Sequence, residues 1–437
     1  MENQLSQVIR DKILSAVDSL PPALTLRNVV LPGIKGKALA VIGMRRAGKT
    51  TFLHQIRRDL IERGRSPERL VYFNFEDERL GEFKSDQLHL VPETHARLFP
   101  NPADEPVGLF LDEIQRVAGW EVFVRRMLDT PGYELYLSGS SAKLLSREIA
   151  TSMRGRAWEI AIHPFSFDEY LRHHGHKAIS DPDLLTSSKR AAVDHHFANY
   201  IVIGGFPEGQ GLLPGERRQL LQGYVDVLLL RDVIERHEVV NPTALRWMVR
   251  RLLGSPAGSF SVTKFASELK SQGIAVGRET LYEFLAHLED AFLLHAIPVA
   301  TDSEKRRQVN PRKVYPADSG LIPVFDRSGK ANVGPALETA VFVELQRRRA
   351  EVTYVKTQGG FEVDFLARYP DGTEELIQVC ASVDDTETLA REVRALEDAE
   401  YPRANRLLLT LESRMPFPEV PASITIQPAW QWILDSA

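Results

Sequence analysis

The sequence predicts an α/β fold in which a parallel β-sheet carries a phosphate-binding loop, and three observations support it. Apolar runs at 38–42, 70–75 and 107–111 have the length and composition of buried strands. The segment from Thr51 onward, TFLHQIRRDLIER, has the apolar spacing of a helix. Between the first run and this helix lies GMRRAGKT, which fits the pattern G-x-x-x-x-G-K-[ST]. Strand, glycine loop and helix in this order are the context in which the pattern binds phosphate.

The residue types in this loop suit the phosphates of a nucleoside triphosphate. Gly43 and Gly48 let the backbone turn so tightly that successive N–H groups point at an anion. Lys49 is expected to reach the β- and γ-phosphates, and the Thr50 hydroxyl is expected to ligate Mg²⁺. The predicted phosphate-binding residues are Gly43, Arg45, Arg46, Ala47, Gly48, Lys49, Thr50 and Thr51.

Length and composition limit the class of protein. A chain of 437 residues is too long for one ordinary core, so about two to four domains are expected. The net charge of -5 means that any nucleic-acid contact depends on a local basic patch. The single cysteine, Cys380, excludes an internal disulfide framework and suits a reducing cytosol. No apolar run approaches the roughly 18–20 residues of a membrane span, and the N-terminus lacks a signal-peptide layout, so a cytoplasmic location without a membrane partner is predicted.

The chain begins with a predicted helix. Residues 3–20 have helical apolar spacing, and Pro21 ends the pattern. After the phosphate loop and its helix, the strand at 70–75 runs into an acidic cluster at 76–78. These carboxylates either face the nucleotide or form a solvated turn.

Two carboxylates follow the third apolar run. Residues 107–111 are almost continuously apolar, as in a central parallel strand buried on both faces, and Asp112 and Glu113 come next. A carboxylate at the carboxyl end of such a strand is the usual second contact to Mg²⁺, so Asp112 is assigned this role. Glu113 is then the natural general base for the attacking water.

A further strand, 135–137, ends in a run of serines. Ser140 is expected to orient the attacking water, with Ser138 and Ser141 as its neighbours. The alternative is that these serines cap the next helix.

A fifth strand, 157–162, is preceded by two arginines. Arg156, ahead of Arg154, is the candidate arginine finger for the γ-phosphate of a neighbouring subunit, which implies a homo-oligomer. A structural salt bridge is an alternative use of the same side chain.

Five segments of the chain together resemble one known family: GMRRAGKTT, LFLDEIQ, LSGSS, GRAWEIAIHPFSFDEYL and IGGFPE. They are similar to the AAA-type ATPases of bacteria and archaea that carry a nuclease-like C-terminal domain of unknown function. The resemblance covers nearly the whole chain, and one small departure is Met44, where the family commonly has proline. It implies an additional-strand P-loop fold over residues 1–165, ATP as the nucleotide and ATP hydrolysis as the activity.

Residues 166–240 are predicted to be mostly helical and to form a lid. The resemblance places the Gly204-Gly205-Phe206-Pro207 turn in this lid, over the nucleotide. A plain glycine–proline turn between helices is equally compatible with these residues.

Residues 241–330 are predicted to form a winged helix-turn-helix. Three helical patterns end with 278–294 as the recognition helix, and the following stretch is the expected hairpin wing. The recognition helix is acidic at Glu279, Glu283, Glu289 and Asp290, so sequence-specific DNA reading is not expected. A nonspecific clamp on double-stranded DNA and a packing module are the alternatives, and the clamp would use the wing cations Lys305, Arg306, Arg307, Arg312 and Lys313.

Residues 331–437 have the layout of a restriction-nuclease-like α/β domain. Glu338 and Asp364 fit the first two positions of its metal site. The third position reads Gln378-Val379-Cys380, where the pattern requires an acid and a lysine. Nuclease activity is therefore not expected, unless Lys356 on the neighbouring strand substitutes for the lysine.

These observations lead to one main hypothesis and two alternatives. The main hypothesis is Mg²⁺-dependent ATP binding and hydrolysis that drives conformational change of the lid, winged-helix and C-terminal domains. The first alternative is a nucleotide-gated switch with slow turnover. The second is an ATP-controlled DNA-binding protein with an inactive nuclease-like domain.

Overall fold

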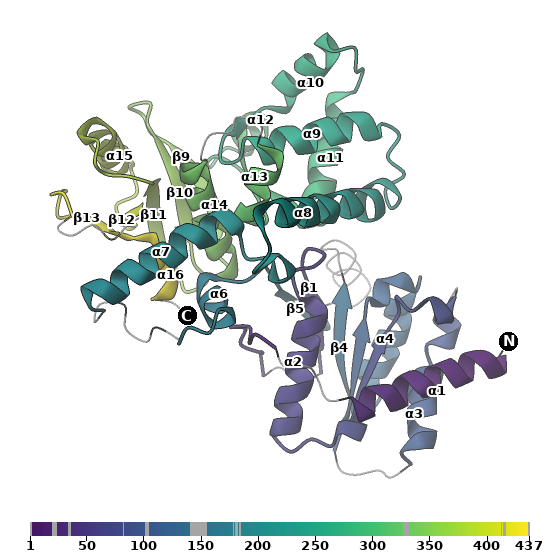
Figure 1. Cartoon of the computed structure of the whole chain (residues 1–437). Coiled ribbons are helices and arrows are strands. Elements are labelled where there is room, and N and C mark those ends of the chain that lie inside the picture. Colours follow the sequence, from purple (N-terminus) through teal and green to yellow (C-terminus); the bar gives the residue numbers. More distant parts are fainter. Residues whose placement is uncertain are drawn as a thin grey trace. The chain divides into compact units, whose positions relative to one another are not determined.

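The computed structural model forms two compact units, Met1–Ile162 and His163–Ala437, whose elements are labelled in Figure 1. Each unit has its own sheets and core. The structure describes residues 2–19, 24–33, 36–81, 83–100, 105–139, 155–177, 179, 182, 185–326, 332–411, 413 and 417–435.

The first unit is built on a five-stranded sheet whose order is β2-β3-β4-β1-β5, and all four neighbouring pairs are parallel. This confirms the predicted α/β fold with a parallel sheet. The strand predicted at 70–75 is β2, at the edge beside β3. The strands are β1 (Ala38–Ile42), β2 (Leu70–Asn74), β3 (Val107–Asp112), β4 (Tyr133–Gly139) and β5 (Ala157–Ala161).

Apolar spacing explains how the helices of the first unit pack. The strands β1 and β3 are buried along their whole lengths, as expected for inner strands of a parallel sheet. In α4 the buried side chains Trp120, Phe123, Val124 and Met127 recur at helical spacing and share one face. The helices are α1 (Glu2–Asp18), α2 (Lys49–Glu62), α3 (Leu90–Leu98) and α4 (Trp120–Asp129).

The first half of the second unit is mainly helical and contains a small antiparallel sheet in the order β6-β8-β7. The helices are α6 (Phe167–His173), α7 (Ser187–Ile203), α8 (Pro214–Leu228), α9 (Pro242–Gly254), α10 (Val262–Ser271), α11 (Arg278–Asp290), α12 (Glu304–Val309) and α13 (Ile322–Phe325). The strands are β6 (Ser259–Phe260), β7 (Leu294–Ile297) and β8 (Arg312–Pro316).

The second half of this unit contains a five-stranded mixed sheet in the order β13-β12-β11-β10-β9. Pairs among β9, β10 and β11 are antiparallel, whereas β11, β12 and β13 run parallel. The strands are β9 (Glu351–Lys356), β10 (Glu362–Arg368), β11 (Glu374–Cys380), β12 (Asn405–Thr410) and β13 (Ile424–Pro428). The helices are α14 (Val333–Arg347), α15 (Thr386–Asp398) and α16 (Ala429–Leu434).

Strand alternation gives this mixed sheet two apolar faces. Phe365 belongs to the cluster that includes residues of α14, and the next residue, Leu366, belongs to the cluster that includes residues of α15. Successive strand residues point to opposite faces, so α14 and α15 cover different faces of the sheet.

Two boundaries differ from the sequence-based expectation. The helix predicted at 278–294 ends at Asp290, because Phe292 adopts a positive φ of 57° and Leu294 already begins β7. The stretch expected to be a plain hairpin wing contains the short helix α12, which Ser303 caps by accepting a hydrogen bond from the Arg306 N–H.

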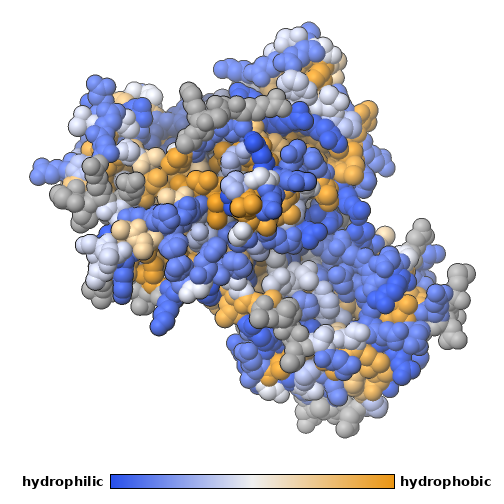
Figure 2. Space-filling view, viewed as in Figure 1, coloured by the Kyte–Doolittle hydropathy of each residue, from blue (hydrophilic) through white to orange (hydrophobic). Residues whose placement is uncertain are grey.

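Much of the visible surface is hydrophilic, with hydrophobic residues in smaller patches between (Figure 2). No helix among the described residues combines the length and apolar character needed to span a bilayer.

Candidate functional site

The phosphate loop connects β1 to α2 through residues with unusual backbone angles. Gly43 has φ 145°, and a Cβ placed there would lie 2.2 Å from the carbonyl oxygen of Ile162. Gly48, which precedes the first residue of α2, has φ 101°. Arg46 is also left-handed, at φ 66°. The pattern therefore places glycine where the loop approaches neighbouring backbone and where it turns into the helix.

The predicted loop residues lie around the start of α2. Lys49 is buried, and its Nζ donates to the carbonyl oxygens of Gly43 at 3.1 Å and Met44 at 3.2 Å. Ala47 is buried as well, whereas Thr50 and Arg46 are exposed. A charged ammonium is thus held against the loop by neutral carbonyl groups, where it can also serve an anion.

Asp112 ends β3 and is fully buried. Its Oδ2 accepts hydrogen bonds from Thr50 Oγ1 at 2.9 Å and from the Tyr72 hydroxyl at 2.6 Å. Its Oδ1 accepts from the Ser138 hydroxyl. Burial and the Asp112 charge raise the pKa of Tyr72, so this phenol stays a neutral donor. Among the described residues, the three donors to this carboxylate are hydroxyl groups.

Glu113 follows directly and is also buried. Its backbone is left-handed at φ 55°, its N–H donates to Ser138 Oγ at 3.0 Å, and its Oε2 accepts from Gln115. Burial raises the pKa of Glu113, and the Asp112 charge acts in the same direction, while Lys49 opposes both. A carboxylate with a raised pKa next to a phosphate loop has the property that a general base for water needs.

The structure adds residues that sequence reasoning did not assign. Tyr72 was placed only within a strand, although a polar aromatic residue in a buried strand commonly needs a partner. Ser138, named only as a neighbour of Ser140, contacts both Asp112 and Glu113. Glu76, from the acidic cluster predicted either to face the nucleotide or to form a solvated turn, lies two residues after β2 and pairs with Arg45 of the loop at 3.4 Å and with Arg116 at 2.7 Å.

Four other predicted residues give a different outcome. Ser140, Ser141 and Arg154 lie outside the described residues. Arg156 is described, and its Nη1 pairs with Asp129 Oδ1 at 2.6 Å in a half-exposed salt bridge. The salt-bridge alternative is therefore present in this structure, and the arginine-finger role stays a prediction.

The predicted cationic wing needs one correction. Lys305 and Arg306 are exposed on α12, Arg307 lies 3.4 Å from Glu351 and Arg312 lies 4.0 Å from Glu289. Lys313 is only 3% exposed. Its inclusion among surface cations was wrong, because β8 is the middle strand of its sheet and the ammonium is buried among carboxylates.

The glycine–proline turn is packed tightly inside the second unit. The Gly205 N–H donates to Asp318 Oδ2 at 2.8 Å, and a Cβ on Gly204 would lie 1.8 Å from Asp318 Oδ1. Burial raises the pKa of Asp318 to about 6, although hydrogen bonds from the Gly205 and Gly320 N–H groups act to lower it. The turn thus has a packing role, and its role in a nucleotide lid stays a prediction.

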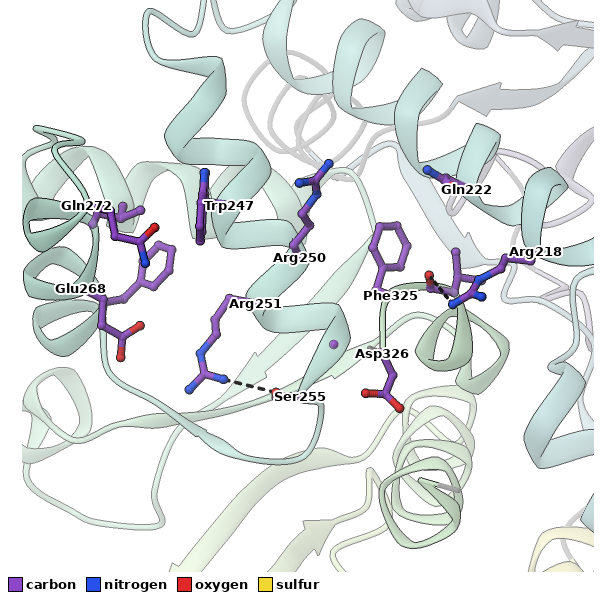
Figure 3. Close-up of a pocket in the computed structure, with 14 residues that line it drawn as sticks. Arg218, Gln222, Trp247, Arg250, Arg251, Ser255, Glu268, Gln272, Phe325 and Asp326 are labelled. Carbon is purple, nitrogen blue, oxygen red and sulfur yellow. Dashed lines mark hydrogen bonds between the residues drawn. The ribbon is translucent and has the colours of Figure 1, made fainter. Parts of the chain in front are cut away.

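A pocket of about 650 Å³ lies among α8, α9, α10 and α13 in the second unit (Figure 3). Its volume is within the usual range for ligand pockets. Arg218 reaches across to the carbonyl oxygen of Pro323 at 3.0 Å, and Arg251 donates to Ser255 Oγ at 3.2 Å. Its lining combines aromatic and cationic side chains, among them Trp247, Phe265, Phe325, Arg218, Arg250 and Arg251.

The parallel sheet and this loop define the first unit as a P-loop domain, and residues 35–171 match the family model of an AAA domain. Residues 194–330 match a domain of unknown function, DUF8612. The chain is 32% identical over 422 residues to the uncharacterized protein MJ1544 of Methanocaldococcus jannaschii, covering 93% of this chain and 90% of that protein. This chain belongs to the same family as that archaeal protein.

Two further similarities concern a bacterial protein and a solved structure. An uncharacterized protein of Haemophilus influenzae is 29% identical over 333 residues, which cover 76% of this chain and 79% of that protein. The Walker-type ATPase PABY2304 of Pyrococcus abyssi is 14% identical, with a TM-score of 0.42 over 73% of this chain and 95% of that chain.

Proposed function

We propose that this protein binds ATP with Mg²⁺ in the first unit and hydrolyses it. The observation that carries the proposal is the 2.9 Å hydrogen bond between Thr50 Oγ1 and Asp112 Oδ2. It joins the last residue of the loop pattern to the carboxylate at the end of an inner strand, although the two residues are 62 positions apart in the sequence. These two oxygens belong to the ligand types that Mg²⁺ prefers, so the residues present fit this metal.

Each residue has a defined part in the proposed reaction. Lys49 and the loop N–H groups bind the phosphates, and Thr50 and Asp112 hold Mg²⁺, which neutralises charge on the β- and γ-phosphates when bound. Glu113 accepts the proton of the attacking water, to which its raised pKa suits it. Ser140 and Arg156 keep their proposed roles in positioning water and in contacting a neighbouring subunit.

Hydrolysis is proposed to drive conformational change in residues 166–240, 241–330 and 331–437, as lid, winged helix and C-terminal domain. The order α9-β6-α10-α11-β7-β8, with the sheet order β6-β8-β7, supports a winged helix. The order α14-β9-β10-β11-α15-β12 supports a nuclease-like domain, and Gln378 in its third metal position supports its inactivity.

A slow-turnover switch is a second candidate, and one contact favours it. Glu113 Oε2 accepts a hydrogen bond from Gln115, within the same turn. If this bond persists with ATP bound, the carboxylate is held away from water and turnover is slow.

ATP-controlled DNA binding is the third candidate. Its support is the exposed pair Lys305 and Arg306, together with the guanidinium groups of the pocket on α8 and α9. Since Lys313 is buried, fewer cations support this function than the sequence suggested.

The test is ATP turnover by the purified protein with Mg²⁺, with and without double-stranded DNA, and with Lys49→Ala as the control. Many turnovers per minute, lost in Lys49→Ala, are expected. Tight ATP binding with negligible turnover would instead support the slow-turnover switch. Absence of ATP binding would reject both ATP hydrolysis and the switch. Stimulation by DNA would select the third candidate.

A further inference from the structure

One lysine in the second unit is surrounded by carboxylates. Lys313 lies on β8 and is 3% exposed. Its Nζ lies 2.8 Å from Asp364 Oδ1, 3.0 Å from Glu362 Oε1 and 3.2 Å from Glu338 Oε1. Glu338 belongs to α14 and the other two acids belong to β10, so a single ammonium joins three elements that are distant in sequence.

The rest of this cluster is held by neutral groups. The Tyr315 hydroxyl donates to Glu338 Oε1 at 2.7 Å, and the Val379 N–H donates to Asp364 Oδ2 at 3.0 Å. Burial opposes the charge on Lys313, but the charges of Asp364, Glu338 and Glu362 raise its pKa above the usual value. The lysine is therefore a charged ammonium at neutral pH. Burial and the Asp364 charge raise the pKa of Glu338, although Lys313 and Tyr315 act to lower it, so Asp364 and Glu362 are the acids whose charges chiefly balance Lys313.

With Lys313 in place, no group of three or more His, Cys, Asp or Glu side chains among the described residues is arranged to hold a metal ion. The carboxylate oxygens lie 2.8–3.2 Å from the ammonium, which are hydrogen-bond distances and longer than the roughly 2.0–2.1 Å of Mg²⁺ coordination. Divalent cations such as Mg²⁺ and Mn²⁺ are bound by carboxylate oxygens that converge on one point. Here Glu338, Glu362 and Asp364 converge on Lys313 Nζ instead. The Gln378 amide is already used, because its Oε1 accepts from the Asp364 N–H at 3.2 Å and its Nε2 donates to Glu392 at 2.6 Å.

We propose that Lys313 is the resident cation of this cluster and fills the position that a divalent metal would need. The ammonium blocks metal binding and at the same time fastens β8 to α14 and β10. The mixed sheet then anchors the small β6-β8-β7 sheet through Lys313. It performs no metal-dependent chemistry. The inference is independent of ATP hydrolysis in the first unit, so either can fail without the other.

The physical consequence is a strong dependence on Lys313. Removing one partner from a buried charge cluster leaves the remaining charges uncompensated, which is among the most destabilising single changes. Lys313→Met keeps the aliphatic length and removes the charge. We expect Tm of the second unit to fall by at least about 5 °C, and we expect the three freed carboxylates to accept a divalent cation.

The experiment is thermal unfolding of the full chain without nucleotide, with and without millimolar Mn²⁺. All proteins carry Asp112→Asn, so that the site in the first unit does not contribute. Mn²⁺ is expected to leave Tm of the Lys313 protein unchanged and to raise Tm of Lys313→Met, and adding Asp364→Asn should abolish the rise. Lys356→Met, which changes an exposed lysine of β9, is the matched control and should behave like the parent.

Several results would overturn the proposal. Lys313→Met with the parent's Tm would show that the ammonium anchors nothing, and a destabilised Lys313→Met that Mn²⁺ does not stabilise would show that the position is not a metal position. If Lys313→Met fails to fold, the proposal is tested on the protein that retains Lys313, by Mn²⁺ binding and by plasmid cleavage. Mn²⁺ binding or Mg²⁺-dependent plasmid cleavage that is lost in Asp364→Asn would mean that Lys313 coexists with a metal, and absence of both supports the proposal.

Discussion

The two units each contain a buried aspartate and a buried lysine, and the partners of the two aspartates differ in charge. Asp112 accepts hydrogen bonds from the hydroxyls of Thr50, Tyr72 and Ser138, while Lys49 donates to backbone carbonyls. Asp364 instead pairs directly with Lys313 at 2.8 Å.

This difference bears on which of the two sites is proposed to take a metal cation. Hydroxyl groups satisfy the hydrogen-bonding capacity of a buried carboxylate without placing a positive charge beside it, which is compatible with the proposed Mg²⁺ contact of Asp112. An ammonium neutralises Asp364 from within the chain. Both side chains are aspartates, so the proposed difference in their roles rests on the charge of their neighbours.

The largest expected effect tests whether the first site is catalytic. Glu113→Gln keeps the shape of the side chain and removes the base, so turnover should fall about 100-fold or more, while ATP affinity stays within a few-fold. Steady-state turnover and equilibrium nucleotide binding measure the two quantities. Equal turnover by Glu113→Gln and the parent would remove Glu113 from the reaction, and Gln115→Ala distinguishes loss of the base from loss of its hydrogen bond.

The next effect tests the backbone that holds Lys49. A Cβ in Gly43→Ala would meet the Ile162 carbonyl oxygen at 2.2 Å, at a φ of 145°. We expect a loss of about 2–4 kcal/mol in the free energy of unfolding of the first unit. Gly64→Ala is the matched control, because Gly64 has φ 95° with open space around it and should cost about 1 kcal/mol. Urea unfolding measures both, and equal losses would contradict the steric argument.

A third buried carboxylate, Asp318, extends the comparison to backbone N–H partners. Its pKa is raised to about 6 from an ordinary 3.8, so the folded state binds its proton more tightly than the unfolded state does. This contribution to stability is fully present below about pH 4 and is lost as the pH rises through about 6. Between pH 7 and pH 4 it should grow by about 1–3 kcal/mol.

Asp318→Ala removes this contribution along with the hydrogen bonds to Gly205 and Gly320. The stability difference between the parent and Asp318→Ala should therefore widen as the pH falls from 7 to 4. Urea unfolding of the second unit at several pH values measures this difference. A difference that stays constant across this range would mean that Asp318 titrates with an ordinary pKa.

The smallest expected effect on stability separates two uses of Arg156. Its salt bridge with Asp129 is half-exposed, and such pairs contribute about 1 kcal/mol or less. Arg156→Ala and Asp129→Ala should therefore have nearly the parent's stability. A loss of ATP turnover in Arg156→Ala alone would identify an arginine finger, whereas unchanged turnover in both would leave only the salt bridge.

The sequence determined the local features of the first unit. The pattern GMRRAGKT fixed the loop, because glycines at Gly43 and Gly48 are required by the backbone itself. Apolar runs located β1, β2 and β3, and the polarity change after Leu111 located Asp112 and Glu113. Each of these features depends on residues that are close together in the sequence. They can therefore be recognised without knowing the tertiary contacts.

Only the tertiary structure decided the partners of these acids. Tyr72 and Ser138 reach Asp112 because β2, β3 and β4 are neighbours in the sheet, and no spacing along the chain records this. In the sequence Lys313 follows four other cations, all of which are exposed or half-buried in the structure. Lys313 itself is buried among carboxylates of α14 and β10. Burial and charge pairing depend on residues that are distant along the chain, which is why the structure could reassign a lysine that the sequence placed at the surface.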